Sequence, residues 1–341
     1  MFNYETRFRY RNIKTDKYED LPFREAFYRL IQEAMINYLT NPIGFIFPFL
    51  KQYRVLNPYK ALNENVDTLF TILKGFCESS KDSSSIYNRA IKLDMFTLDE
   101  VFRDSICFLL AGMDTTASGI AATLYYLKKR PDVMKKLKEE LIKSDMGYLS
   151  KENLFQEPIG DADSSAPGLV HPVPNDHLKN LYKHIQNCDY ITYVFKEVCR
   201  LDSPGMFSIR YEALEDIKIC GVPIPKGTIL DMNAYGPHLD KEQWKQPLDF
   251  IPERFDPMSD MFNKPSSNGT TGKSRHPKSM VPFSSGIRIC PGQALATLET
   301  KIVVSRIINR IEYEIDAKQL ANPNACFNVT SQLHVKGKIL K

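Results

Sequence analysis

A single cysteine in a short glycine-containing loop, residues 283–292, constrains this chain more than any other feature. The loop reads Phe-Ser-Ser-Gly-Ile-Arg-Ile-Cys-Pro-Gly, and an apolar run at helical spacing follows at residues 294–311. A tight turn and a helix N-terminus both direct backbone N–H groups toward a sulfur placed between them, which favours the thiolate. Because a thiolate is a good ligand for soft metal ions, the loop predicts that Cys290 binds a metal.

Composition sets broad limits on the class of protein. The chain has 341 residues, of which 43% are hydrophobic and 25% charged, as is typical of a soluble protein with a large core. Its net charge of +4 is small for this length, so we expect no nucleic-acid partner. Seven cysteines without a Cys-x-x-Cys pair argue against a disulfide framework or a zinc site. His171, His177 and His184 lack metal-ligand spacing, so we expect no metal cluster there.

The order of periodic segments predicts a mainly α fold with a small β portion (α+β). Apolar residues recur at helical spacing in six segments, 22–39, 58–78, 97–129, 133–141, 182–201 and 294–311. Thr97 and Glu100 form a capping box at the start of the third. Short runs punctuated by Gly and Pro predict strands at 208–211, 216–221, 222–230, 313–316 and 328–335. The first 20 residues show no clear period, and we expect them to form a solvated edge segment.

The longest apolar run, residues 105–127, has the length of a membrane span. Asp114, Thr115, Thr116 and Ser118 lie at its centre, where lipid would penalise them. We therefore expect a buried helix of a soluble core. The first seven residues also lack the apolar core of a signal peptide.

The same helical run carries a candidate catalytic group. It contains Ala-Gly-Met-Asp-Thr-Thr at residues 111–116. A glycine at mid-helix costs about 1 kcal/mol relative to alanine, which a groove for a ligand would justify. Thr115 beside Asp114 offers a hydroxyl backed by a proton source. Taken alone, the run is equally compatible with a polar stripe on a packed helix.

A candidate ion network and a candidate anion-binding arginine follow along the chain. Glu197 and Arg200 are three residues apart, so they share one face of their predicted helix. A buried pair would need a further partner, and Arg254 in Pro-Glu-Arg-Phe offers one. Arg210 lies on a predicted strand ten residues after Arg200, where a solvent-exposed side chain is one interpretation.

In this order, the four sites resemble the cytochrome P450 family, from about residue 22 to the C-terminus. The loop matches the family's Phe-x-x-Gly-x-Arg-x-Cys-x-Gly pattern at Phe283, Gly286, Arg288, Cys290 and Gly292. The resemblance implies a cytochrome P450 fold that binds haem b, with Cys290 as the axial ligand of the iron. It also implies that Phe283 packs near the sulfur and that Gly286 and Gly292 allow a tight turn close to the porphyrin. A buried structural cysteine is the alternative for Cys290.

The resemblance assigns roles to the other sites as well. Thr115 would hydrogen-bond bound dioxygen, Asp114 would supply protons, and Ala111 and Gly112 would line the oxygen pocket. Arg210, like Arg288, would pair with a haem propionate. The remaining three residues would form a structural network rather than take part in the chemistry, namely Glu197, Arg200 and Arg254.

The implied function is that of a haem-thiolate monooxygenase, which inserts one atom of O₂ into a small apolar organic substrate. Its electrons would come from NADPH through a flavin-containing reductase, docked by basic residues such as Lys273 and Lys278. Two alternatives remain open. One is a non-oxygenating member of the same fold that rearranges peroxides, against which Thr115 and Asp114 argue. The other is a catalytically silent helical protein that does not retain haem.

The resemblance also implies how the domain is organised. In the family, strands and helices that cover one side of the haem precede the matched region, and microsomal members add a membrane anchor. We expect residues 1–341 to be a single cytochrome P450 domain, N-terminally incomplete, of the microsomal eukaryotic type. This implies the cytoplasmic face of the endoplasmic reticulum membrane. The aromatic loop at residues 43–50 is either a buried loop or the lip of a substrate channel or of a peripheral membrane contact.

Overall fold

The computed structural model describes a little more than the helical and strand-forming parts of the chain. These are residues 7–12, 14–23, 25–30, 33, 59–79, 89, 92–93, 96–143, 182, 185, 187–205, 210–233, 235–316, 318 and 333–339. They divide into two compact units, and the boundary falls after Ala111, within helix α5 (Leu98–Lys129). The three histidines at which we expect no metal cluster, and the aromatic loop at residues 43–50, lie outside the described residues.

In the first unit, an antiparallel hairpin packs against a helix. Strands β1 (Arg7–Arg11) and β2 (Tyr18–Pro22) pair, and Phe8 and Tyr10 of β1 are fully buried beside helix α3 (Tyr59–Ser79). Asn65 of α3 accepts the Arg11 N–H at 2.7 Å and donates to the Arg11 carbonyl at 2.9 Å. The expectation of a solvated segment was therefore wrong. The alternation of arginine with aromatic residues is that of a half-buried strand.

The start of α5 has the capping box that the sequence predicts. The Thr97 N–H donates to Glu100 Oε2 at 2.8 Å, and the Glu100 N–H donates to Thr97 Oγ1 at 3.3 Å. Two N–H groups at this end of the helix are thereby satisfied reciprocally. The long apolar segment is thus a helix with a defined N-terminus. Among the described helices, none combines the length and hydropathy needed to cross a membrane.

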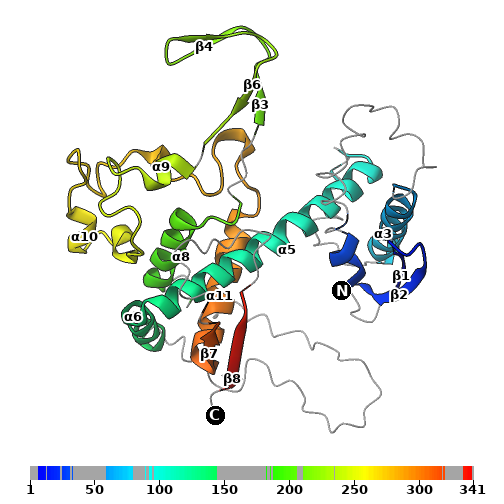
Figure 1. Ribbon diagram of the computed structural model, residues 1–341, viewed down its shortest axis with the longest axis horizontal. Coiled ribbons are helices and arrows are strands. Elements are labelled where there is room, and N and C mark those ends of the chain that lie inside the picture. Colours follow the sequence, from blue (N-terminus) through cyan, green and yellow to red (C-terminus); the bar gives the residue numbers. More distant parts are fainter. Residues whose placement is uncertain are drawn as a thin grey trace. The chain divides into compact units, whose positions relative to one another are not determined.

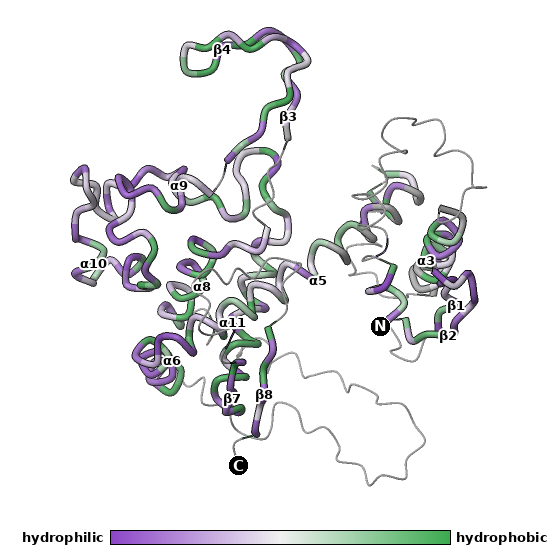
Figure 2. The backbone as a smooth tube through the Cα atoms, viewed as in Figure 1, coloured by the Kyte–Doolittle hydropathy of each residue, from purple (hydrophilic) through white to green (hydrophobic). Residues whose placement is uncertain are grey.

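The core of the second unit consists of α6 (Pro131–Lys143), α8 (Asp189–Leu201), α11 (Gln293–Arg310) and the C-terminal part of α5. Helices α8 and α11 lie side by side (Figure 1). Val133, Leu137 and Leu141 form the buried face of α6, as their spacing predicts, and Figure 2 shows hydrophobic and hydrophilic stretches alternating along this helix.

Helix α8 begins at Asp189, later than the predicted start at residue 182. Its N-terminus is satisfied from another helix, because the Tyr190 N–H donates to both carboxylate oxygens of Glu140 on α6, at 2.9 and 3.1 Å. A carboxylate at a helix N-terminus also interacts favourably with the helix dipole. The start of α8 is thus defined by a partner fifty residues away in the sequence.

The β structure of the second unit consists of two-stranded antiparallel pairs. Strands β3 (Arg210–Glu212) and β6 (Ile229–Asp231) pair and lead into the hairpin of β4 (Ile217–Ile219) and β5 (Val222–Ile224) (Figure 1). At the C-terminus, β7 (Ile311–Ile315) pairs with β8 (Val335–Ile339). The predicted strand at 328–335 lies outside the described residues up to residue 332; residues 333 and 334 are not in a strand, and β8 begins at Val335. Helices with small antiparallel sheets confirm the mainly α class with a small β portion.

Two contacts fix α5 against the C-terminal sheet. The Tyr313 hydroxyl donates to the Leu124 carbonyl at 2.8 Å, and Lys128 Nζ donates to the Tyr313 carbonyl at 2.9 Å. Tyr313 is buried, so its hydroxyl would be costly to leave unpaired. This anchoring sets the position of the α5 segment that carries Asp114 and Thr115.

Short helices connect the remaining elements. They are α9 (Tyr235–Leu239), α10 (Asp260–Asn263) and the 3₁₀ helices η3 (Pro252–Phe255), η4 (Pro277–Ser279) and η5 (Gly286–Arg288).

Candidate functional site

The cysteine loop is closed by its own backbone. The Ser284 N–H donates to the Val281 carbonyl at 3.0 Å, and the Cys290 N–H donates to the Phe283 carbonyl at 2.9 Å. Ser284 and Gly286 both have left-handed backbone angles, with φ of 64° and 76°. A residue without Cβ adopts this conformation at no steric cost, so the backbone accounts for glycine at position 286. The Cys290 side chain itself is exposed.

Helix α11 starts immediately after the cysteine. Gly292 is its N-cap, and the Ala296 N–H donates to the Gly292 carbonyl at 2.8 Å. Gly292 has φ of −84° and ψ of 1°, which other residues also adopt, and a Cβ there would lie 3.8 Å from Cys290 Sγ, an ordinary contact. Of the two loop glycines, only Gly286 therefore has a backbone that specifically favours glycine.

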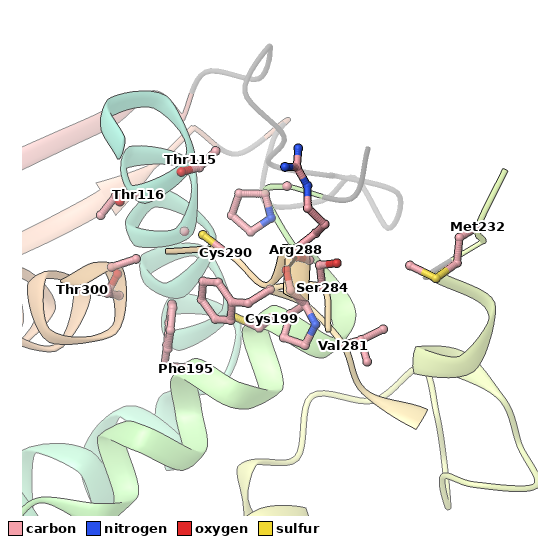
Figure 3. A pocket seen from close by; sticks show the side chains of 17 residues that line it. Thr115, Thr116, Phe195, Cys199, Met232, Val281, Ser284, Arg288, Cys290 and Thr300 are labelled. Carbon is pink, nitrogen blue, oxygen red and sulfur yellow. Dashed lines mark hydrogen bonds between the residues drawn. The ribbon is translucent and has the colours of Figure 1, made fainter. Parts of the chain in front are cut away.

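Cys290 lines a cavity of about 250 Å³ (Figure 3). Helix α5 contributes Thr115 and Thr116 to its wall, and α8 contributes Phe195 and Cys199. The loop and α11 complete the wall with several residues, among them Phe283, Ser284, Arg288 and Thr300. The thiol of the loop and the hydroxyls of α5 therefore border the same space.

Two hydroxyls in the cavity wall are buried without a hydrogen-bond partner among the described residues. They are Ser284 Oγ and Thr300 Oγ1. An unpaired buried hydroxyl costs about 1–3 kcal/mol, so these two atoms are unsatisfied polar groups in the cavity wall. The sequence pointed to neither residue, because a single serine or threonine near a motif has no distinguishing pattern.

The structure brings some of the predicted site residues to the cavity and not others. Thr115, Phe283, Arg288 and Cys290 line it. Ala111, Gly112 and Asp114 lie on the same helix as Thr115 but are not among the described lining residues. Arg210 is the first residue of β3, with its backbone paired to Asp231, and its side chain lies outside the described part of the chain.

Asp114 is half-buried, and this burial raises the pKa of its carboxyl group. Removing a carboxylate from water disfavours its charged form. Asp114 consequently holds its proton to a higher pH than an exposed aspartate does.

The predicted ion network is assembled and buried beside the loop. Arg200 binds Glu197 through two bonds, Nε to Oε2 at 2.8 Å and Nη2 to Oε1 at 2.9 Å, and Arg254 Nε donates to Oε1 at 3.0 Å. The three side chains are at most 1% exposed. Backbone carbonyls accept further guanidinium N–H groups, including those of Lys245 and Gln246 for Arg254. The donors of both arginines are thus used internally, as a buried pair requires.

His238 and Trp244, which the sequence did not single out, complete this network. Two guanidinium groups contact the Trp244 ring, with Arg275 at 3.7 Å and Arg200 at 5.0 Å from its centroid. The His238 carbonyl accepts Arg200 Nη1 at 2.9 Å. The contacts of His238 and Trp244 depend on partners far along the chain, so no local sequence pattern predicts them.

Histidine at position 238 is expected to make folding stability depend on pH. Burial, together with the charge of Arg200, lowers the pKa of His238 from 6.5 to about 4. Between these values the unfolded chain binds more protons than the folded protein, so stability is complete above pH 6.5 and falls as the pH decreases toward 4. The loss between pH 7 and pH 5 is about 2 kcal/mol.

Urea unfolding at pH 7 and at pH 5 measures this dependence. The His238→Gln variant should lose about 2 kcal/mol less over this interval than the parent protein. The exposed His276, changed to glutamine, provides the control and should keep the parental dependence. Equal dependence in parent and His238→Gln would contradict the prediction.

The sequence model of the cytochrome P450 family matches residues 12–144 and 170–339. The chain therefore belongs to the cytochrome P450 family, whose members generally bind haem through a cysteine thiolate.

Several curated relatives are similar at low identity. Cytochrome P450 3A2 from Rattus norvegicus is 25% identical over 293 residues, which are 86% of this chain and 48% of that protein. Probable cytochrome P450 525A1 from Dictyostelium discoideum is 26% identical over 299 residues, and the match covers 82% of this chain and 43% of that protein. 7-ethoxycoumarin O-deethylase from Helianthus tuberosus is 25% identical over 327 residues, and the match covers 89% of this chain and 56% of that protein. The chain thus spans about half the length of the curated relatives it matches.

Proposed function

We propose that this chain carries the haem-binding part of a monooxygenase that acts on small apolar organic substrates. The observation that supports this best is the shared cavity of Cys290 and Thr115. A soft thiol donor from one element and a hydroxyl that follows a half-buried aspartate on another border one space. Residues 1–341 would then belong to a single cytochrome P450 domain.

The donor set at the cavity fits haem. Cys290 would provide a thiolate ligand for the iron, and the exposed Arg288 guanidinium, with Arg210, would bind the propionates. Phe283 would cover the sulfur side. When bound, haem supplies the iron at which O₂ is reduced by two electrons and split, one oxygen atom going to the substrate and the other to water.

The chain's own residues would then hold and move protons. The Thr115 hydroxyl lies in the cavity wall, and Asp114 precedes it on α5. Because burial raises the pKa of Asp114, its carboxyl group is a better reservoir of protons near neutral pH than an exposed aspartate. Thr115 would deliver these protons to the cavity, and apolar wall residues such as Phe195 and Val281 would limit the entry of bulk water.

The reduced protein, treated with CO, tests the proposal. Thiolate-ligated haem has a red-shifted Soret band, and this band is the expected result for the purified chain reconstituted with haem. Absence of any haem spectrum after reconstitution would overturn the proposal in favour of a silent helical protein.

Replacing Thr115 by alanine is expected to uncouple oxygen reduction from substrate oxidation. Without the hydroxyl, proton delivery loses its positioned donor, and a misplaced proton relay costs about 10²- to 10⁴-fold in rate. The ratio of NADPH consumed to product formed measures this loss. The Thr123→Ala variant is the control, since Thr123 lies on the same helix and its hydroxyl donates to the Gly119 carbonyl at 2.7 Å. An unchanged ratio in Thr115→Ala would favour the peroxide-rearranging alternative.

We propose a flavin-containing NADPH reductase as the electron donor, docked by Lys273 and Lys278. Both are exposed in the segment before the cysteine loop. Reversing both charges, Lys273→Glu with Lys278→Glu, should reduce reductase-dependent turnover about tenfold at low salt and less at high salt. The control reverses two exposed lysines of the β4–β5 region, Lys218 and Lys226. Unchanged turnover in the Lys273→Glu, Lys278→Glu variant would contradict this docking site.

We also propose that the protein works at the cytoplasmic face of the endoplasmic reticulum membrane, as membership of the microsomal type would imply. Fractionation of cells that express the full-length protein tests this location, and recovery in another compartment would contradict it.

A further inference from the structure

His238 connects the buried ion network to the segment that leads into the cysteine loop. The residue lies on α9 and its side chain is fully buried. Its carbonyl accepts Arg200 Nη1 at 2.9 Å, and its Nε2 accepts the Val281 N–H at 2.8 Å. A single residue thus contacts both the network and the start of the loop, and the His238–Val281 bond spans 43 positions in the sequence.

The bond to Val281 acts on the loop at the residue where its first turn begins. The Val281 carbonyl accepts the Ser284 N–H at 3.0 Å, and Phe283, inside this turn, accepts the Cys290 N–H at 2.9 Å. Val281, Phe283 and Cys290 all line the cavity (Figure 3). A displacement of Val281 would therefore move the carbonyl that holds the cysteine backbone.

The neighbouring contact is weaker. Ser203 Oγ donates to the Pro282 carbonyl, but at 3.4 Å, near the limit for a hydrogen bond. Of these two side-chain hydrogen bonds to the segment, the one to the His238 imidazole is the shorter, at 2.8 Å.

The chemistry of the bond identifies which atom of the histidine is needed. A backbone N–H only donates, so Nε2 must carry a lone pair, and the proton of the neutral ring resides on Nδ1. Nδ1 is buried and has no hydrogen-bond partner among the described residues. An N–H that is buried without an acceptor is itself destabilising. The hydrogen bond from the Val281 N–H to Nε2 offsets this destabilisation.

We propose that His238 is a positioning residue for Cys290, acting through Val281 and the turn at Phe283. The role of Cys290 as a metal ligand rests on the proposed function, whereas the mechanical link from His238 to the loop does not. The link predicts a specific order among substitutions. Glutamine places an acceptor near the position of Nε2 and should preserve the bond, whereas asparagine places its polar atoms near Nδ1 and should break it.

Amide hydrogen exchange across the whole chain tests the link directly, without cofactor. In the His238→Asn variant, exchange in residues 281–290 should rise about three- to tenfold, as expected for the loss of one hydrogen bond, while α6 and α8 keep their parental rates. The His238→Gln variant should return the loop to within about twofold of the parent. The control is His276→Ala, because His276 Nδ1 accepts the Lys278 N–H at 3.0 Å in the same kind of bond, but at an exposed site. It should leave residues 281–290 unchanged.

Three results would overturn the proposal. They are equal loop exchange in the asparagine and glutamine variants, a uniform rise of exchange throughout the chain, and no change in either variant. If His238→Asn does not fold, the parent protein alone tests the link. The hydrogen bond to His238 should protect the Val281 amide, so this amide should be among the slowest to exchange between residues 281 and 290. A fast Val281 amide contradicts the link.

The spectrum of the reduced protein with CO separates this inference from the proposed function. The thiolate-type Soret band should weaken in His238→Asn and recover in His238→Gln. If loop exchange follows the expected order but even the parent protein lacks this band, the positioning link stands and the proposed function fails. If the parent has the band and all variants keep it with unchanged exchange, the function stands and the link fails.

Discussion

Replacement of Cys290 by serine is expected to abolish the thiolate-type Soret band of the reduced protein with CO. Serine has nearly the same size, but its hydroxyl is not ionised near neutral pH and is a poor ligand for soft metals. The loop should remain intact, because its closing bond comes from the Cys290 backbone N–H and not from the sulfur. We therefore expect loss of the spectrum, and of any monooxygenase activity, with little change in stability.

The matched control is Cys220→Ser. Cys220 is also exposed, but it lies in the turn between β4 and β5. This variant should keep the parental spectrum. Retention of the thiolate-type band in Cys290→Ser would mean that another cysteine binds the iron, and Cys199, in the same cavity wall, would be the first to examine.

The largest effect on stability is expected for Glu197→Gln. This change leaves Arg200 and Arg254 buried without the carboxylate that binds them both. Removing one partner of a buried ion pair costs about 3–5 kcal/mol, a large part of the stability of an average domain. Urea unfolding should show this loss, or the variant should fail to accumulate as folded protein.

An exposed carboxylate in the same unit allows a matched comparison. Glu314 pairs with Lys128 at 3.0 Å, but its side chain is 71% exposed. The Glu314→Gln change should cost less than about 1 kcal/mol. Similar losses in the two variants would show that burial is not what makes the Glu197 network important.

Local patterns sufficed where partners lie close in sequence. The spacing of Val133, Leu137 and Leu141 identified the buried face of α6, and Thr97 with Glu100 identified the start of α5. Each depends only on contacts within one or two helical turns. The Glu197–Arg200–Arg254 set was found by order along the chain, although its burial depends on α8 packing against η3.

The predictions failed where a distant partner decides the structure. Phe8 and Tyr10 are buried because α3 covers β1, and the alternating arginines concealed this in the sequence. The start of α8 depends on Glu140 of α6. His238 had no local signal at all, since its role comes from Val281.

The bond between Glu140 and the α8 N-terminus has a consequence for protein engineering. It ties α6 to α8 directly, across fifty positions of the sequence. The entropic cost of closing a connection grows only slowly with its length. A variant with a longer connection between α6 and α8 should therefore keep this direct contact and lose little stability from loop closure.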